Sequence, residues 1–90
     1  MTELNKKVAV ITGASSGIGK GIALKLSNEG ATVVLVARDE KKLDQVSTEL
    51  RKAGAKNYEI ISADVTNRED IDRAVQQAVE EFGKVDILVN

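Results

Sequence analysis

The stretch VAVITGASSGIGKGIALKL, residues 8–26, joins a short β-branched run to four glycines within nine residues and then to an apolar helical pattern. The run over residues 7–12 has the composition of a strand that is covered on both faces. A helix should follow the glycines, because apolar residues recur there at helical spacing. These residues are Ile18, Ile22, Ala23, Leu24 and Leu26. The stretch therefore predicts a strand that turns directly into a helix.

The rest of the chain continues this alternation of strands and helices. Asp39 should cap the second helix, which ends before Gly54. Thr66 and Glu69 form a capping box for the third helix, which ends at Gly83. Since each crossover requires a right-handed parallel connection, we expect an α/β fold of the Rossmann type, with helices on both faces of a parallel sheet in the strand order 3-2-1-4. The remaining strands are expected at residues 31–37, 58–62 and 85–89.

Length and composition limit the classes of function. The 90 residues suffice for one domain, and 42% hydrophobic with 30% charged residues indicates a globular chain. The 13 basic and 14 acidic residues are interleaved, so no basic surface for nucleic acid is expected. The pattern lacks a membrane span and a signal peptide, which predicts a cytoplasmic protein. Without Cys or His, disulfides, soft metal sites and histidine-based catalysis are excluded, and no metal site is expected.

The glycines after the first strand suit a phosphate site. A sharp turn from strand to helix leaves the first helical amides unpaired, and the helix dipole favours negative charge there. Gly13 would permit the turn, Gly17 would leave room for a close ligand, and Gly19 would let the helix approach the sheet. The alternative is that these glycines serve only the turn and the packing. Their G-x-x-x-G-x-G spacing fits neither the Walker loop nor the G-x-G-x-x-G fingerprint.

The segment TGASSGIG, residues 12–19, resembles the first motif of the short-chain dehydrogenase/reductase family. The resemblance extends over all 90 residues. Residues 63–65 resemble the family segment that contacts the adenine ring. The segment DILVN, residues 86–90, resembles the strand that leads into the family's N-N-A-G motif, of which only Asn90 is present. Among family members, the 3-oxoacyl-[acyl-carrier-protein] reductase type is the most similar in style.

The resemblance implies a dinucleotide across the carboxyl ends of the strands, where open parallel sheets generally bind ligands. Gly13, Ser15, Ser16 and the backbone of Ile18 would surround its phosphates. Ser15 or Ser16 could instead serve as the helix N-cap. Either role satisfies groups at the start of the first helix.

The resemblance also implies contacts to the rest of the dinucleotide. Asp64 would accept a hydrogen bond from the adenine amine, and Val65 would lie against the ring. Asn90 would reach the ribose region. Two structural alternatives stay open, with Asp64 as a turn residue after a strand and Asn90 as a strand terminator.

Arg38 predicts the choice of nicotinamide cofactor. Dinucleotide folds place an acid near the end of the second strand to hold a ribose 2′-hydroxyl, whereas an arginine there accommodates a 2′-phosphate. Arg38 lies 19 residues after Gly19, and Ala37 stands where the acid would be. We therefore expect NADP(H) rather than NAD(H), although Asp39 is close enough to compete and Arg38 could be an ordinary solvated charge. The expected cofactor-binding residues are Gly13, Ser15, Ser16, Gly17, Ile18, Gly19, Arg38, Asp64, Val65 and Asn90.

The chain lacks the family's catalytic pair, a tyrosine four residues before a lysine. Its one tyrosine, Tyr58, is followed at that spacing by Ser62 and is interpreted as a packing residue. No catalytic residue is therefore assigned. We expect residues 1–90 to be part of an NAD(P)-binding domain that is truncated after the fourth strand, from an oxidoreductase interconverting a small carbonyl and an alcohol.

Two other functions share features of this pattern. The chain could be a minimal dinucleotide-binding module without chemistry, or part of a methyltransferase on a related sheet. The glycine spacing and Arg38 disfavour the methyltransferase. Because the fourth strand would form an edge of the sheet, we also expect copies of the chain to associate through it as a homo-oligomer.

Overall fold

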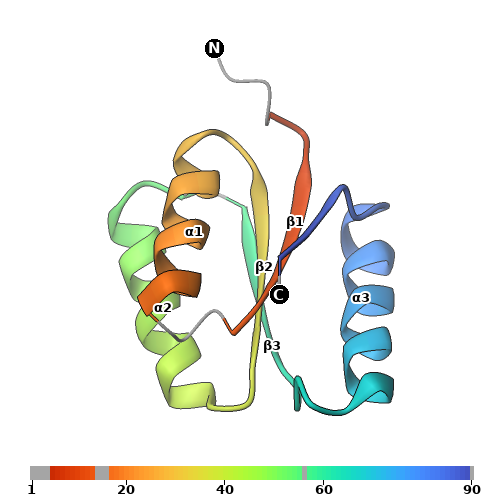
Figure 1. Ribbon diagram of the computed structural model, residues 1–90. Helices are drawn as coiled ribbons and strands as arrows, with labels where there is room; N and C mark the ends of the chain where they lie inside the picture. The colour runs from red at the N-terminus through yellow and green to blue at the C-terminus, as the bar shows by residue number, and fades with distance from the viewer. Residues whose placement is uncertain (1–4, 14–16, 56, 90) are drawn as a thin grey trace.

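The computed structural model describes residues 5–13, 17–55 and 57–89. Its four strands are parallel and are ordered β3-β2-β1-β4. The helices α1 and α2 cover one face of the sheet and α3 covers the other (Figure 1). This confirms the predicted Rossmann-type α/β fold. The elements in chain order are β1 (Val8–Thr12), α1 (Gly17–Asn28), β2 (Thr32–Ala37), α2 (Glu40–Lys52), β3 (Tyr58–Ser62), α3 (Arg68–Phe82) and β4 (Ile87–Val89).

The two central strands explain why the apolar runs are continuous. Side chains alternate along a strand, so Val33 and Leu35 pack against α1 and α2, whereas Val34 and Val36 pack against α3. All four are fully buried. Each buried side chain of this size contributes about 1.5–3 kcal/mol to folding. Burial of apolar side chains on both faces therefore stabilises the sheet. The sheet in turn positions the residues at the ends of its strands.

The second helix begins and ends where the sequence indicates. Asp39 caps α2, since its Oδ1 accepts hydrogen bonds from the amides of Lys41 and Lys42 at 3.0 and 3.2 Å. At the other end Gly54 has a φ of 93°, and the amides of Gly54 and Ala55 donate to carbonyls of the last turn. Of the helices described, the longest has 15 residues. None of them is long and apolar enough to cross a membrane.

The predicted capping box of Thr66 and Glu69 is wrong. Asn67 caps α3 instead, because its Oδ1 accepts hydrogen bonds from the amides of Glu69 and Asp70 at 2.9 and 3.3 Å. The amide and hydroxyl of Thr66 both donate to Asp64, at 2.9 and 2.6 Å. Thr66 therefore belongs to the turn that follows β3 and not to the helix.

The fourth strand is shorter than the predicted residues 85–89. Its ladder begins at Ile87, and Asp86 joins it to β1 from outside the strand. The Oδ2 of Asp86 accepts a hydrogen bond from the Val8 amide at 2.9 Å, and the Asp86 amide donates to the Val8 carbonyl at 2.9 Å. The Val8 amide, together with the Lys84 ammonium at 3.2 Å, lowers the pKa of Asp86. Asp86 therefore has a structural partner at the amino end of the sheet.

Candidate functional site

The carboxyl ends of β1, β2 and β3 lie at one edge of the sheet, at the lower end in Figure 1. Parallel strands bring their carboxyl ends to the same edge, so residues distant in sequence meet there. The order β3-β2-β1-β4 makes β1 the strand at which the direction of winding reverses. Open α/β sheets bind ligands at this switch point.

Gly13 makes the first turn at this edge. Its φ is 68°, in the left-handed region that favours glycine, and its amide donates to the Val36 carbonyl at 3.0 Å. The chain therefore leaves β1 while still bonded to β2. Beside it the Thr12 hydroxyl donates to the Val89 carbonyl at 3.1 Å and so joins the ends of β1 and β4. Sequence reasoning gave Thr12 no structural role, because the partner strand lies 77 residues away.

At the start of α1, a Cβ built on Gly17 would meet no atom of the described residues within 4 Å, apart from its chain neighbours and the backbone of its own helix, so packing among these residues does not require glycine there. Ile18 is 81% exposed, whereas Gly19 is buried against the sheet. A helix N-terminus without large side chains can bind an anion through its main-chain amides. Ser15, Ser16 and Asn90 lie outside the described residues.

Arg38 and Asp64 form an ion pair across the ends of β2 and β3. The Arg38 Nη2 lies 2.8 Å from Asp64 Oδ1. The register pairs Ala37 with Ser62, which places the residues just beyond these strands side by side. Ser62 adds a hydrogen bond from its hydroxyl to the Arg38 carbonyl at 3.2 Å. The sequence named Asp39 as the competitor for Arg38, but Asp39 caps α2 and Asp64 is the partner.

The Asp64 carboxylate is held from several sides. Hydrogen bonds from the Thr66 side chain, then from Arg38 and the Thr66 amide, lower the pKa of Asp64 to about 2. The contact between Arg38 and Asp64 also raises the pKa of Arg38, first through the hydrogen bond and then through the charge of Asp64. The Asp64 amide donates to Asp70 Oδ2 at 3.0 Å, which ties the turn to the first turn of α3. Both groups are therefore fully ionised near neutral pH.

Apolar surface completes this edge. Val65, which follows Asp64, is 43% exposed, and Ile18, in the first turn of α1, is 81% exposed. Exposed aliphatic groups of this kind offer flat contact to a ring without providing a hydrogen bond. Tyr58 contributes nothing here, because it begins β3 at the opposite edge and packs against the core beneath α1 and α2, as expected.

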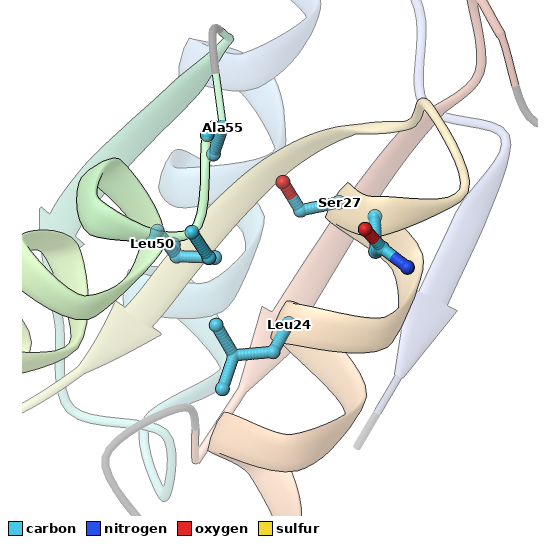
Figure 2. A pocket seen from close by; sticks show the side chains of 7 residues that line it. Leu24, Ser27, Leu50 and Ala55 are labelled. Atoms are coloured by element: carbon cyan, nitrogen blue, oxygen red, sulfur yellow. The ribbon is translucent and has the colours of Figure 1, made fainter.

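A small cavity lies at the other end of the molecule. It has a volume of about 120 Å³ and separates the last turns of α1 and α2, where Leu24 and Leu50 point toward each other (Figure 2). A neighbouring hollow of about 270 Å³ shares Ser27, Gly54 and Ala55 with it. The carboxyl ends of helices present carbonyl oxygens, which disfavour phosphate. The cavity therefore does not suit a phosphate, whereas the amino end of α1 at the carboxyl edge of the sheet does.

Fold and site together define a Rossmann-type α/β protein with a glycine turn at its switch point. A profile of the short chain dehydrogenase family matches residues 7–90. The chain belongs to this family.

Curated relatives and solved structures agree with the assignment. An uncharacterized oxidoreductase of Staphylococcus saprophyticus is 47% identical over 90 residues, which are 100% of this chain and 38% of the relative. A glucose dehydrogenase of Caenorhabditis elegans, solved in its apo form, is 37% identical with a TM-score of 0.93, over 99% of this chain and 38% of that chain. A metagenomic short-chain oxidoreductase solved with NADP is 41% identical with a TM-score of 0.87, over 94% and 38%. The chain thus spans 38% of the length of each of these proteins.

Proposed function

We propose that the carboxyl edge of this chain binds NADP(H) in preference to NAD(H), as part of an oxidoreductase that interconverts a carbonyl and an alcohol. One observation carries the cofactor choice: Ala37 stands where an acid would hold a 2′-hydroxyl, and Arg38, the next residue after β2, is 72% exposed. A guanidinium presents a fork of donors that matches phosphate oxygens. The related short-chain oxidoreductase solved with NADP supports the proposal.

Each part of the edge has a task in this proposal. Gly13 and Gly17 keep side chains away from the pyrophosphate, so that main-chain amides at the start of α1 bind it. Asp64 accepts a hydrogen bond from the adenine amine, Val65 provides apolar contact to the ring, and the backbone of Ile18 lies at the phosphates. The bound nicotinamide would supply or accept the hydride. The remaining proposed contacts, Gly19, Ser15, Ser16 and Asn90, complete the binding set.

Within residues 1–90 we propose binding and orientation of the cofactor, with no catalytic residue. The chain would then be the cofactor-binding part of a larger domain, which acts on a small carbonyl or alcohol. Cytoplasmic residence and likeness to the 3-oxoacyl-[acyl-carrier-protein] reductase type stay predictions from the sequence. The alternative of a dinucleotide-binding module without chemistry shares the same site.

Replacing Arg38 by Asp tests the cofactor choice. Hydrogen bonds to charged groups contribute about 1.5–3 kcal/mol, so the affinity for NADP⁺ should fall at least about tenfold while NAD⁺ binding is retained. Isothermal titration calorimetry with both oxidised dinucleotides measures this ratio. Arg51→Asp reverses a charge in the last turn of α2 and is the control that should leave the ratio unchanged. An unaltered preference in Arg38→Asp would remove Arg38 from the site.

We further propose that copies of the chain associate through β4. Among the strands of the described residues β4 lies at an edge of the sheet, and its Leu88 is 49% exposed. Unpaired edges with apolar side chains promote pairing, and lysine on an edge prevents it. Sedimentation velocity should show a dimer that Leu88→Lys converts to a monomer. A monomer at the highest concentration measured for the unmodified chain would contradict this association.

A further inference from the structure

The ion pair of Arg38 with Asp64 joins two residues to which the proposed function gives separate tasks. Arg38 faces the 2′-phosphate and Asp64 faces the adenine, yet the two side chains touch at 2.8 Å. Oδ1 of Asp64 receives the Arg38 Nη2 together with the amide and hydroxyl of Thr66. No hydrogen bond from any described residue reaches Oδ2. One oxygen of the Asp64 carboxylate thus holds both Arg38 and the two Thr66 donors.

The stability of the fold does not account for this pair. The side chains of Arg38 and Asp64 are 72% and 35% exposed. Ion pairs exposed to this degree contribute little to folding, because water screens them and ordering the side chains costs entropy. The consequence of the contact is electrostatic and local: the arginine and the carboxylate form a site of zero net charge. A 2′-phosphate, with a charge near −2, would meet a neutralised cation there.

We propose that Asp64 is a specificity-determining residue that limits the preference for NADP(H) over NAD(H) by neutralising Arg38. The inference rests on the proposed function, in which Arg38 faces the 2′-phosphate. The carboxylate repels the phosphate and competes for the guanidinium, but it has no such effect on a 2′-hydroxyl. The affinities for NADP(H) and NAD(H) therefore differ less than they would if Arg38 were present without Asp64.

Asp64→Asn isolates the charge from the hydrogen bonds. The asparagine Oδ1 keeps an acceptor for Arg38 and for both Thr66 donors, so the turn is retained. Any change in adenine binding affects both dinucleotides equally and cancels in the ratio of dissociation constants. Titration calorimetry with NADP⁺ and NAD⁺ should give a ratio shifted about five- to tenfold further toward NADP⁺, the size of one exposed unit charge at short range. The gain should shrink as KCl is raised, since salt screens charge but does not alter shape.

Glu81→Gln provides the matched control. It makes the same change in net charge in the last turn of α3, at the opposite end of the sheet. Its ratio should equal that of the unmodified chain. Asp64→Ser is the second variant, should the amide prevent folding, and thermal unfolding of each protein without dinucleotide verifies its fold. Serine also removes the charge, so the ratio should move in the same direction.

The outcomes separate this inference from the proposed function. A ratio within twofold of the unmodified chain, or one shifted toward NAD⁺, overturns the inference while binding of NADP⁺ by the unmodified chain still supports the proposed function. A shift toward NADP⁺ that does not respond to KCl also overturns it, because the effect would then not be charge. Absence of binding of either dinucleotide to the unmodified chain overturns both.

Discussion

Gly17→Val is expected to weaken binding of both dinucleotides by at least about a hundredfold. In the proposed function the first amides of α1 contact the pyrophosphate directly. A branched side chain at residue 17, the first residue of α1, would fill the space between these amides and the pyrophosphate. Loss of two hydrogen bonds to charged oxygens costs about 3–6 kcal/mol, which is more than a hundredfold in affinity. Titration calorimetry with NADP⁺ measures the loss.

The same substitution should leave the fold intact. Apart from its chain neighbours and its own helix backbone, a Cβ on Gly17 meets no atom of the described residues within 4 Å, and the helix propensity of valine is better than that of glycine by a few tenths of a kcal/mol. The thermal midpoint without dinucleotide should therefore stay level or rise slightly. Gly21→Val is the matched control, because a Cβ on Gly21 also meets open space one turn further along α1. Undiminished affinity in Gly17→Val would show that these amides do not bind the pyrophosphate.

The fold was predictable because local and long-range signals agree. Continuous β-branched runs such as residues 8–12 suit only strands buried on both faces, and helical spacing follows each of them. Asp39 caps α2 by contacts two and three residues away, which the sequence itself displays. The order of parallel strands then follows from the handedness of the connections.

The sequence did not show which residue caps α3, because two neighbouring residues could each do so. Thr66 and Asn67 are both good N-caps, and Thr66 is taken by Asp64, so the helix begins after Asn67. The sequence also does not show which acidic residue forms the ion pair with Arg38. Asp39 is adjacent along the chain, but the pairing of β2 with β3 brings Asp64 to the guanidinium. The electrostatics of the candidate site therefore required the register of the sheet.

Leu35→Ala should cause the largest loss of stability, about 2–5 kcal/mol. Leu35 is fully buried in β2, and that strand is flanked by β1 and β3 and covered by α1 and α2. Neighbours held in a sheet on both sides cannot collapse into the vacated volume, so the cavity persists. Domains of this size have a free energy of unfolding near the low end of about 5–15 kcal/mol, and the variant would keep only a small part of it.

Urea denaturation followed by circular dichroism measures this loss, and Leu24→Ala gives the comparison. Leu24 is half-buried on α1 and already borders the cavity of about 120 Å³, so its truncation removes fewer contacts and should cost markedly less. If Leu35→Ala lowered the free energy of unfolding no more than Leu24→Ala does, the residues around Leu35 in β2 would be able to close the cavity, which contradicts the prediction. Because ligand binds only the folded chain, saturating NADP⁺ should restore part of the stability of Leu35→Ala, as linkage requires. The sheet that fixes the carboxyl edge and the ligand that occupies it would then stabilise each other.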